Sequence, residues 1–283
     1  VDIVQPNIDA ALLSRVVGGN PSEILGALNA NGHLFLVNPN GIIFGKNAKV
    51  DVHALIASTL DISDSAFLSG NISFSGDSEA AVINLGSISA DSFAALIAGK
   101  VTNAGSITAP GGDAALLAAD ATLEVGEAAG GKIALDLSGL LEGVASNTGS
   151  IDVASADGQG GSATILGDQV SSSGSIDASG ATGGGHVRIG GDYQGANADL
   201  ANASQANVSG TISADATANG DGGRVIVWAD ENTEFSGSIS VNGGERSGDG
   251  GFVETSGKQV LDFTGVVDAS APNGQTGDLL LDP

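Results

Sequence analysis

The 283-residue chain contains no cysteine and no methionine, and only 4% of its residues are aromatic. The absence of cysteine excludes disulfides, thiolate zinc sites and cysteine nucleophiles. It also suits a chain that crosses an oxidising compartment unfolded. The apolar residues, 41% of the chain, are mainly Ala, Val, Ile and Leu. This amount argues against disorder, and such small aliphatic side chains suit a narrow, repetitive interior.

Positive charge is also scarce, since nine Lys and Arg oppose 33 Asp and Glu for a formal net charge of -24. Such a chain repels phosphates, so neither nucleic acid nor an anionic membrane surface is expected as a partner. No run of about 18 apolar residues occurs, which argues against membrane insertion. The first six residues lack the basic region and the apolar run of a signal peptide, so we expect a processed or excised segment.

Glycine is abundant, with 45 residues against six prolines. Many glycines belong to a repeated Gly-Ser/Thr-Ile element, and others form Gly-Gly pairs that precede apolar strands. The Gly-Ser/Thr-Ile elements start at Gly86, Gly105, Gly149, Gly174, Gly210 and Gly237, with a Gly-Val-Val variant at Gly265. The Gly-Gly pairs are Gly160-Gly161, Gly184-Gly185, Gly222-Gly223 and Gly250-Gly251. Each repeat therefore carries at least two strands.

The spacing of these elements varies from 19 residues (105 minus 86) to 44 residues (149 minus 105). A β-propeller needs four strands in each blade of roughly 40 residues, and leucine-rich repeats need their Leu/Asn pattern, so neither fits. A parallel β-helix, in which each coil lays strands on two or three stacked sheets, tolerates insertions at its corners. We therefore predict an all-β fold, a right-handed parallel β-helix that forms a single continuous rod.

Alternation within the elements predicts which side chains point inward. In Ile151-Asp152-Val153 the first and third residues are apolar and the middle one is polar, and the pattern recurs from Ile176, Ile212 and Ile239. Successive strand residues point to opposite faces, so we expect an internal aliphatic ladder and an external ladder of Asp and Ser. The glycines are expected to supply positive φ or close packing at the corners.

The first part of the chain departs from the repeat. The sequence Asn20-Pro21-Ser22-Glu23 resembles a helix start, which predicts a short helix from Ser22 to Leu28. No Pro-rich or charged linker divides the chain. We predict one continuous structural domain, in which residues 1–65 form a modified first region and residues 66–283 form the repetitive β-helix coils.

Two runs in the first region, RVVGGNPSEILG (residues 15–26) and NANGHLFLVNPNGIIFG (residues 29–45), are similar to a known family, and residues 50–60 continue the likeness. They resemble the secretion domain of two-partner-secretion exoproteins, the filamentous-haemagglutinin-like class. Residues 250–257 and 267–274 also resemble these adhesins. The signature turn of the family corresponds here to Asn38, Pro39, Asn40, Gly41 and Ile42.

The resemblance implies export across the outer membrane of a Gram-negative bacterium through a dedicated β-barrel transporter, followed by surface display or release as an adhesin-type rod. It makes residues 1–65 secretion-domain-like, makes the Asn38 to Ile42 turn the recognition site for the transporter, and suggests host or cell-surface glycans as partners. From the residues alone, Asn-Pro-Asn-Gly is simply a good turn sequence. Because the chain starts inside the family pattern without its usual cap, we expect copies to stack end to end into filaments.

A carbohydrate-active enzyme is the alternative interpretation, because parallel β-helices include polysaccharide lyases and glycosidases. The best candidate group is His186, Arg188 and Asp192, since alternation places His186 and Arg188 on the same outer face. Tyr193 and Trp228 are candidate sugar-stacking platforms. A lyase or glycosidase would also need clustered or paired carboxylates, and acidic residues are too abundant here for chance alignment to be discounted. We therefore predict a solvated face and no enzyme.

Metal and cofactor sites are not predicted either. His33 and His53 are isolated in the sequence, and no His-x-x-x-His spacing occurs. Asp157, Asp221 and Asp249 lie beside Gly-rich corners, but the tandem Gly-Gly-x-Gly-x-Asp nonapeptides of calcium β-rolls are missing. We expect neither a metal nor a cofactor.

Overall fold

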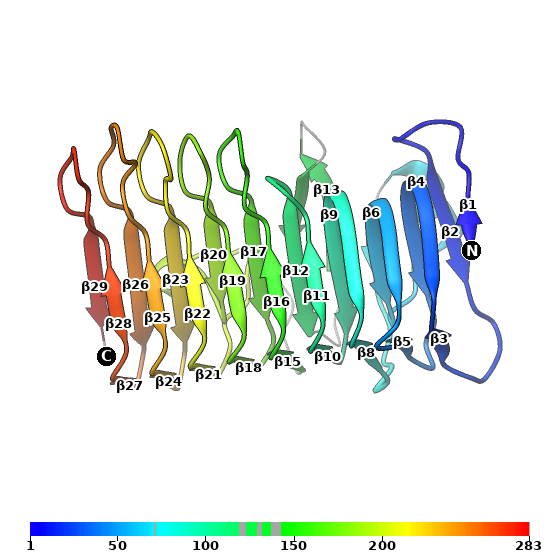
Figure 1. Ribbon diagram of the computed structural model, residues 1–283. Coiled ribbons are helices and arrows are strands. Elements are labelled where there is room, and N and C mark those ends of the chain that lie inside the picture. Colours follow the sequence, from blue (N-terminus) through cyan, green and yellow to red (C-terminus); the bar gives the residue numbers. More distant parts are fainter. Residues whose placement is uncertain (71, 119–122, 129–131, 137–142, 283) are drawn as a thin grey trace.

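The structure, a computed structural model, describes residues 1–70, 72–118 and 143–282, together with the backbone of residues 123–128 and 132–136. Coils of strands stack along one axis, and the two chain ends lie at opposite ends of the rod (Figure 1). Strands of successive coils pair in parallel. The fold is the all-β parallel β-helix that the sequence predicted.

Each coil contributes to three columns of strands. The short-strand column and the long-strand column belong to one 17-stranded sheet, and the third column is a separate nine-stranded parallel sheet. The short-strand column runs through β1 (Asp2–Ile3), the first halves of β4 (Ala27–Val37), β6 (Lys49–Ser58) and β9 (Ser87–Ala98), then β11 (Ser106–Thr108), β16 (Ser150–Asp152), β19 (Ser175–Asp177), β22 (Thr211–Ser213), β25 (Ser238–Ser240) and β28 (Val266–Asp268). The long-strand column runs through β2 (Ala11–Arg15), the second halves of β4, β6 and β9, then β12 (Asp113–Ala118), β17 (Ser162–Leu166), β20 (His186–Ile189), β23 (Arg224–Ala229), β26 (Phe252–Gly257) and β29 (Asp278–Asp282). The third column contains β3 (Ser22–Ile24), β5 (Ile42–Phe44), β8 (Ala81–Asn84), β10 (Lys100–Asn103), β15 (Val144–Asn147), β18 (Gln169–Ser172), β21 (Gln205–Val208), β24 (Asn232–Phe235) and β27 (Val260–Phe263).

The Gly-Ser/Thr-Ile elements form the short-strand column in register, so that Ile107 pairs with Ile88 on one side and with Ile151 on the other. Their glycines stack backbone on backbone. A Cβ on Gly149 would lie 2.0 Å from the carbonyl oxygen of Gly105, closer than any real side chain allows. Close packing between coils, rather than a positive φ, therefore requires glycine in this ladder.

The inward side chains of the three columns fill one apolar core. The isoleucines of the Gly-Ser/Thr-Ile elements are at most 2% exposed: Ile88, Ile107, Ile151, Ile176, Ile212 and Ile239. The third residues of the alternating pattern, such as Val153 and Val241, are fully buried. The predicted internal ladder is confirmed, and each buried isoleucine contributes roughly 1.5–3 kcal/mol.

A second apolar cluster, which the sequence did not predict, lies on the outer face of the long-strand column. Phe35, Ile56 and Phe93 belong to it, and Phe67 and Ile72 pack against it from an excursion of the chain outside the coils. The ring centroids of Phe35 and Phe67 lie 5.2 Å apart in an edge-on contact. One strand of this excursion, β7 (Ile72–Phe74), joins two strands from later in the chain, β13 (Leu123–Ala128) and β14 (Lys132–Asp136), in a small antiparallel sheet.

The helix predicted from Ser22 to Leu28 is wrong, because Ser22 begins strand β3, which pairs with β5. The Ser22 N–H donates to the Gly41 carbonyl at 2.9 Å, and its hydroxyl accepts from the Asn38 side chain at 2.9 Å instead of capping a helix. An α-helix occurs instead at α1 (Asp64–Ser69), where the Ser63 hydroxyl accepts from a backbone N–H of the first turn at 3.1 Å.

The predicted first region and the predicted repetitive coils share one sheet. Strand β6, which lies before residue 65, pairs in register with β9, which lies after it, from Lys49↔Ser87 to Ser58↔Ile97 with one irregularity between Val52 and Ala54. The boundary at residue 65 stays a prediction.

Candidate functional site

The turn from Asn38 to Ile42 connects β4 to β5 and is held from inside by Asn38. The side chain of Asn38 is fully buried, and its Nδ2 donates to the Asn20 carbonyl at 3.0 Å and to the Ser22 hydroxyl at 2.9 Å. Its backbone N–H donates to the Ser58 carbonyl on the next coil at 2.9 Å. Asn38 therefore links the turn to the coil before it and to the coil after it.

The same side chain also shapes the turn itself. Asn38 Oδ1 accepts from the Asn40 backbone N–H at 3.0 Å, and Gly41 N–H donates to the Asn38 carbonyl at 3.0 Å. Gly41 has φ +111, a conformation that side chains disfavour. Ile42 is buried, whereas Pro39 and Asn40 are exposed. In the folded chain, only Pro39 and Asn40 of these five residues present an exposed surface to a partner.

The second candidate group, His186, Arg188 and Asp192, comes together on the outer face of the long-strand column. Val187 and Ile189 are fully buried, so the alternation prediction for β20 is confirmed. The three residues line a cavity of about 370 Å³, which we call the arginine groove; the remaining lining residues are Tyr193, Ala196, Asn197 and Arg224. Arg224 joins the group because it pairs in register with His186 across the coil boundary.

Asp192 is an ionised acceptor in this groove. Burial alone raises its pKa. Hydrogen bonds from the Asn197 side chain and the Tyr193 N–H, both 2.8 Å, lower the pKa, as do the charges of Arg188 and Arg224, and together they outweigh the effect of burial. The net effect is a lowered pKa. The Arg188 Nε lies 3.4 Å from Asp192 Oδ2, a loose ion pair.

Tyr193 and Trp228, the two candidate platforms, differ in access. Tyr193, in the short 3₁₀ turn η1 (Tyr193–Gly195), is 40% exposed, whereas Trp228 is 6% exposed and donates its Nε1–H to Asp230 Oδ1 at 3.2 Å. The Arg224 guanidinium lies 4.9 Å from the centre of the Tyr193 ring and 5.0 Å from that of Phe252. Tyr193 alone is therefore accessible as a platform.

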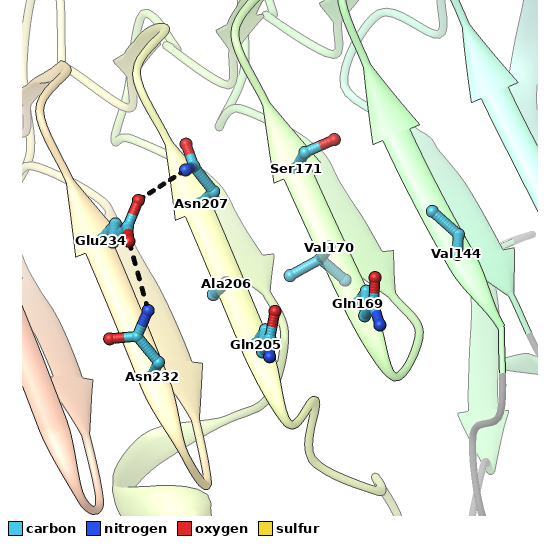
Figure 2. A pocket seen from close by; sticks show the side chains of 9 residues that line it. All are labelled: Val144, Gln169, Val170, Ser171, Gln205, Ala206, Asn207, Asn232 and Glu234. Atoms are coloured by element: carbon cyan, nitrogen blue, oxygen red, sulfur yellow. Dashed lines mark hydrogen bonds between the residues drawn. The ribbon is translucent and has the colours of Figure 1, made fainter.

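A shallow pocket of about 210 Å³ on the outer face of the third column was not predicted (Figure 2). Gln169, Gln205 and Asn232 stack there in register from coil to coil. Glu234 accepts from Asn207 at 2.8 Å and from Asn232 at 3.4 Å. The signal for this amide row was present in the sequence, because these positions precede each Gly-Ser/Thr-Ile element by a constant five residues.

The two histidines that are isolated in the sequence meet in the structure. The rings of His33 and His53 stack with centroids 5.5 Å apart, and His53 Nδ1 lies 3.5 Å from Asp91 Oδ2. Sequence reasoning missed this contact because it depends on coil-to-coil register. In the described part of the chain, no group of three or more His, Asp or Glu residues is placed to hold a metal ion.

The aspartates beside the Gly-rich corners connect coils. Asp221 Oδ1 accepts from the Asp249 backbone N–H at 2.7 Å, and Asp249 Oδ1 accepts from the Gln275 N–H at 2.7 Å. They thus serve backbone hydrogen bonding. Among the described residues, no helix has both the length and the apolar character needed to cross a bilayer.

Comparison with known proteins identifies a family and several proteins that this chain resembles. The TPS secretion domain family matches residues 1–214. Two heme/hemopexin-binding proteins of Haemophilus influenzae are 39% identical over 119 residues and 47% identical over 62 residues, which is 38% and 22% of this chain. These matches span only 13% and 7% of the two relatives. The crystal structure of the HMW1 secretion domain from Haemophilus influenzae superimposes with a TM-score of 0.60 and 27% identity over 98% of this chain and 88% of that one.

The family match covers more than half of the chain and includes the Asn38 turn and every lining residue of the arginine groove except Arg224. It also agrees with the resemblance found in residues 15–45. Two of these relatives are named as heme/hemopexin-binding proteins, and the third is a secretion domain. The chain therefore belongs to the TPS secretion domain family, whose members interact with an outer-membrane transporter during export and reach the cell surface or the extracellular space.

Proposed function

We propose that the Asn38 to Ile42 turn is the surface by which this secretion domain engages its outer-membrane transporter, and that Pro39 and Asn40 make the contact. The observation that carries the proposal is that the residues of the turn are divided into a buried residue that holds the backbone and exposed residues that can reach a partner. Asn38 is buried and holds the backbone, which leaves Pro39 and Asn40 exposed in a fixed pose. Rigid presentation of this kind lowers the ordering cost of binding.

The test compares two exposed asparagines of one coil in the full precursor. We expect Asn40→Ala to trap protein in the periplasm at unchanged expression, because it removes a contact side chain. Asn47→Ala is the matched control, since Asn47 is exposed in the next turn of the same coil, and it should leave secretion normal. The measurement is the fraction of exoprotein outside the cell.

Asn38→Ala tests the supporting role of the turn. It removes the hydrogen bonds of the Asn38 side chain with Asn20, Ser22 and Asn40, so we expect both impaired secretion and lowered stability of the purified domain. Normal secretion of the double variant Asn38→Ala with Asn40→Ala would contradict the proposal for the whole turn.

The exported rod is proposed to act as a surface adhesin that binds host or cell-surface glycans. Support comes from the regular outer faces of the coils, which repeat side chains at the inter-strand spacing of about 4.8 Å and so offer extended surfaces. Adhesion of cells that display the full exoprotein, compared with cells that lack it, tests this role.

End-to-end association is the second finer proposal. Support comes from the parallel pairing of successive coils along the rod, a pairing that one copy could continue onto another. Such a contact between copies does not close and therefore propagates. Sedimentation of the purified segment should show concentration-dependent filaments, and a monomer at every concentration would refute the stacking.

A carbohydrate-active enzyme remains the second candidate, favoured by one observation: His186, Arg188 and Asp192 do share a cavity. In a screen of acidic polysaccharides we expect no cleavage by the parent protein. Cleavage that Arg188→Ala abolishes would establish the enzyme instead.

A further inference from the structure

The arginine groove gathers cationic side chains on a strongly acidic chain. Only nine Lys and Arg occur in 283 residues of net charge -24, yet two arginines and one of the three histidines line this one cavity. The register explains how they meet. His186 pairs with Arg224, and Arg224 pairs with Phe252, so one outward row crosses three successive coils.

The two arginines retain capacity for a ligand. Arg188 has one carboxylate neighbour, Asp192, at 3.4 Å, which is longer than the 2.7–2.9 Å typical of a strong charge-assisted hydrogen bond. The guanidinium of Arg224 has neither a hydrogen bond nor an ion pair within the described ranges 1–70, 72–118 and 143–282, and it lies 4.9 Å from the centre of the Tyr193 ring and 5.0 Å from that of Phe252, two rings that contact each other edge-on. A guanidinium fixed in this way keeps donors available for a planar anion.

The remaining lining suits a sugar. Tyr193 is 40% exposed and offers an apolar ring with a hydroxyl. Asp192 and Asn197 supply polar groups that can pair with hydroxyls. A volume of about 370 Å³ lies at the small end of the range for small-molecule sites, enough for one or a few sugar residues.

The groove continues along the rod into a second cavity of about 530 Å³. The two cavities share His186 and Arg224, and the second follows the Gly-Gly corners of three coils, Gly184, Gly222–Gly223 and Gly250–Gly251. These corners carry no side chains, so the surface stays open there. Asp221 and Asp278 line this part and provide acceptors rather than cations.

We propose that the arginine groove binds a glycan through one carboxylated sugar residue, whose carboxylate lies between Arg188 and Arg224 and whose ring packs on Tyr193. Neutral sugar residues of the same glycan extend over the Gly-Gly corners. A single carboxylate fits better than a polyanion, because the rest of the surface is acidic and repels repeated negative charge. The proposal gives a ligand class to the adhesin role and rests on that role for its biological meaning.

The experiment is a titration of the purified protein, at physiological ionic strength, with sialyllactose, with methyl glucuronide and with lactose. Sialyllactose and methyl glucuronide represent two sources of a carboxylated sugar, and lactose is the neutral reference. We expect at least one acidic ligand to bind and lactose not to bind. The acidic ligand that binds identifies the sugar type.

Three variants locate the site. Arg188→Gln and Arg224→Gln should each weaken binding about tenfold or more, as loss of a charge-assisted hydrogen bond predicts. Arg246→Gln is the matched control, because it removes the same charge from an exposed loop outside the groove, and it should leave affinity unchanged within about twofold. Thermal unfolding of each variant checks the fold. If Arg224→Gln unfolds, Arg224→Lys replaces it, because Lys keeps the positive charge and lacks the guanidinium fork, and its affinity for the acidic ligand should also fall.

Failure of both acidic ligands to bind, equal binding of lactose, or an equal loss in Arg246→Gln would overturn the proposal. The adhesin role fails separately. Loss of cell adhesion in Arg224→Gln supports both proposals. Adhesion that persists in a variant unable to bind the sugar would show that the groove binds the sugar but that adhesion does not depend on it.

Discussion

At the scale of single residues, Glu254 is the least expected side chain in the rod. It lies on the outward row of β26 yet is fully buried, and it accepts from the Gln194 backbone N–H at 3.0 and 3.2 Å. Gln194 has φ +53, the only positive φ outside glycine among the described residues. Burial raises the pKa of Glu254, although the Gln194 hydrogen bond and the Arg224 charge oppose this shift. Glu254 thus fixes the turn that carries Tyr193.

A raised pKa determines how this carboxyl changes stability with pH. The folded state takes up the proton at a higher pH than the unfolded state, whose value is near 4.5. The ionised form at neutral pH therefore lowers the free energy of unfolding, and stability is regained as pH falls toward 4.5. Asp192 and Asp268 have lowered pKa values, so their contributions are present above about 3.8 and are lost below it.

We predict that Glu254→Gln raises the free energy of unfolding at pH 7 by up to about 1 kcal/mol, because it removes a buried charge and keeps an acceptor for Gln194. The advantage over wild type should shrink between pH 7 and pH 4.5. Urea unfolding at several pH values measures both effects. An advantage that grows on acidification in this window would contradict the assignment.

At the scale of elements, the corner between the third column and the Gly-Ser/Thr-Ile elements carries a buried amide ladder. Asn84 donates to Asn103 at 2.8 Å, Asn103 donates to Asn147 at 2.9 Å, and Asn147 reaches Ser172 at 3.4 Å. All three asparagines are fully buried, and each lies two residues before the glycine of its element. The ladder pairs polar groups that would be costly to bury alone.

Further along the rod, the same corner changes from amide to aromatic. The equivalent positions are Val208, Phe235 and Phe263, and the last two rings stack with centroids 5.3 Å apart. The corner thus accepts either paired amides or stacked rings, because both repeat at the coil spacing.

We predict that Asn103→Ala lowers the free energy of unfolding by about 2–3 kcal/mol, since it leaves a donor on Asn84 and an acceptor on Asn147 without their partners. Asn207→Ala is the matched control. It removes an exposed amide that bonds Glu234 and should change stability by less than about 0.5 kcal/mol. Equal effects of the two substitutions in urea unfolding would show that the ladder adds nothing beyond surface hydrogen bonding.

At the scale of the whole molecule, charge and stacking oppose each other. The net charge of -24 lies on a rod in which the same outward position recurs at every coil, as in the paired Asp152 and Asp177. Like charges in register repel across a spacing of about 4.8 Å, while the buried ladders hold the coils together. The acidic surface repels other acidic molecules. Repulsion among its own carboxylates also lowers the stability of the folded rod.

We predict that added NaCl stabilises the rod. The Debye length falls from about 30 Å at 0.01 M to about 8 Å at 0.15 M, so repulsion between exposed carboxylates is screened. The midpoint of thermal unfolding should rise by a few degrees over this range. A midpoint that stays constant or falls would show that surface repulsion does not limit stability.

The sequence by itself determined the architecture and the family. The Gly-Ser/Thr-Ile elements fix a strand, its inward Ile and a tight corner within a few residues, so their recurrence predicts a parallel β-helix without any knowledge of loops. The run around Asn38 likewise predicts its turn, because Asn, Pro and Gly set local backbone angles. Whether the turn binds the transporter stays a prediction.

Only the tertiary structure decided what meets across coils. The partners of Asn38 are 16 and 18 residues away, His33 stacks on His53, and Arg224 joins His186 from 38 residues further along the chain. Each contact depends on register between coils whose lengths vary from 19 to 44 residues. A one-residue slip would reverse every outward and inward side chain, and only packing of the whole rod fixes that register.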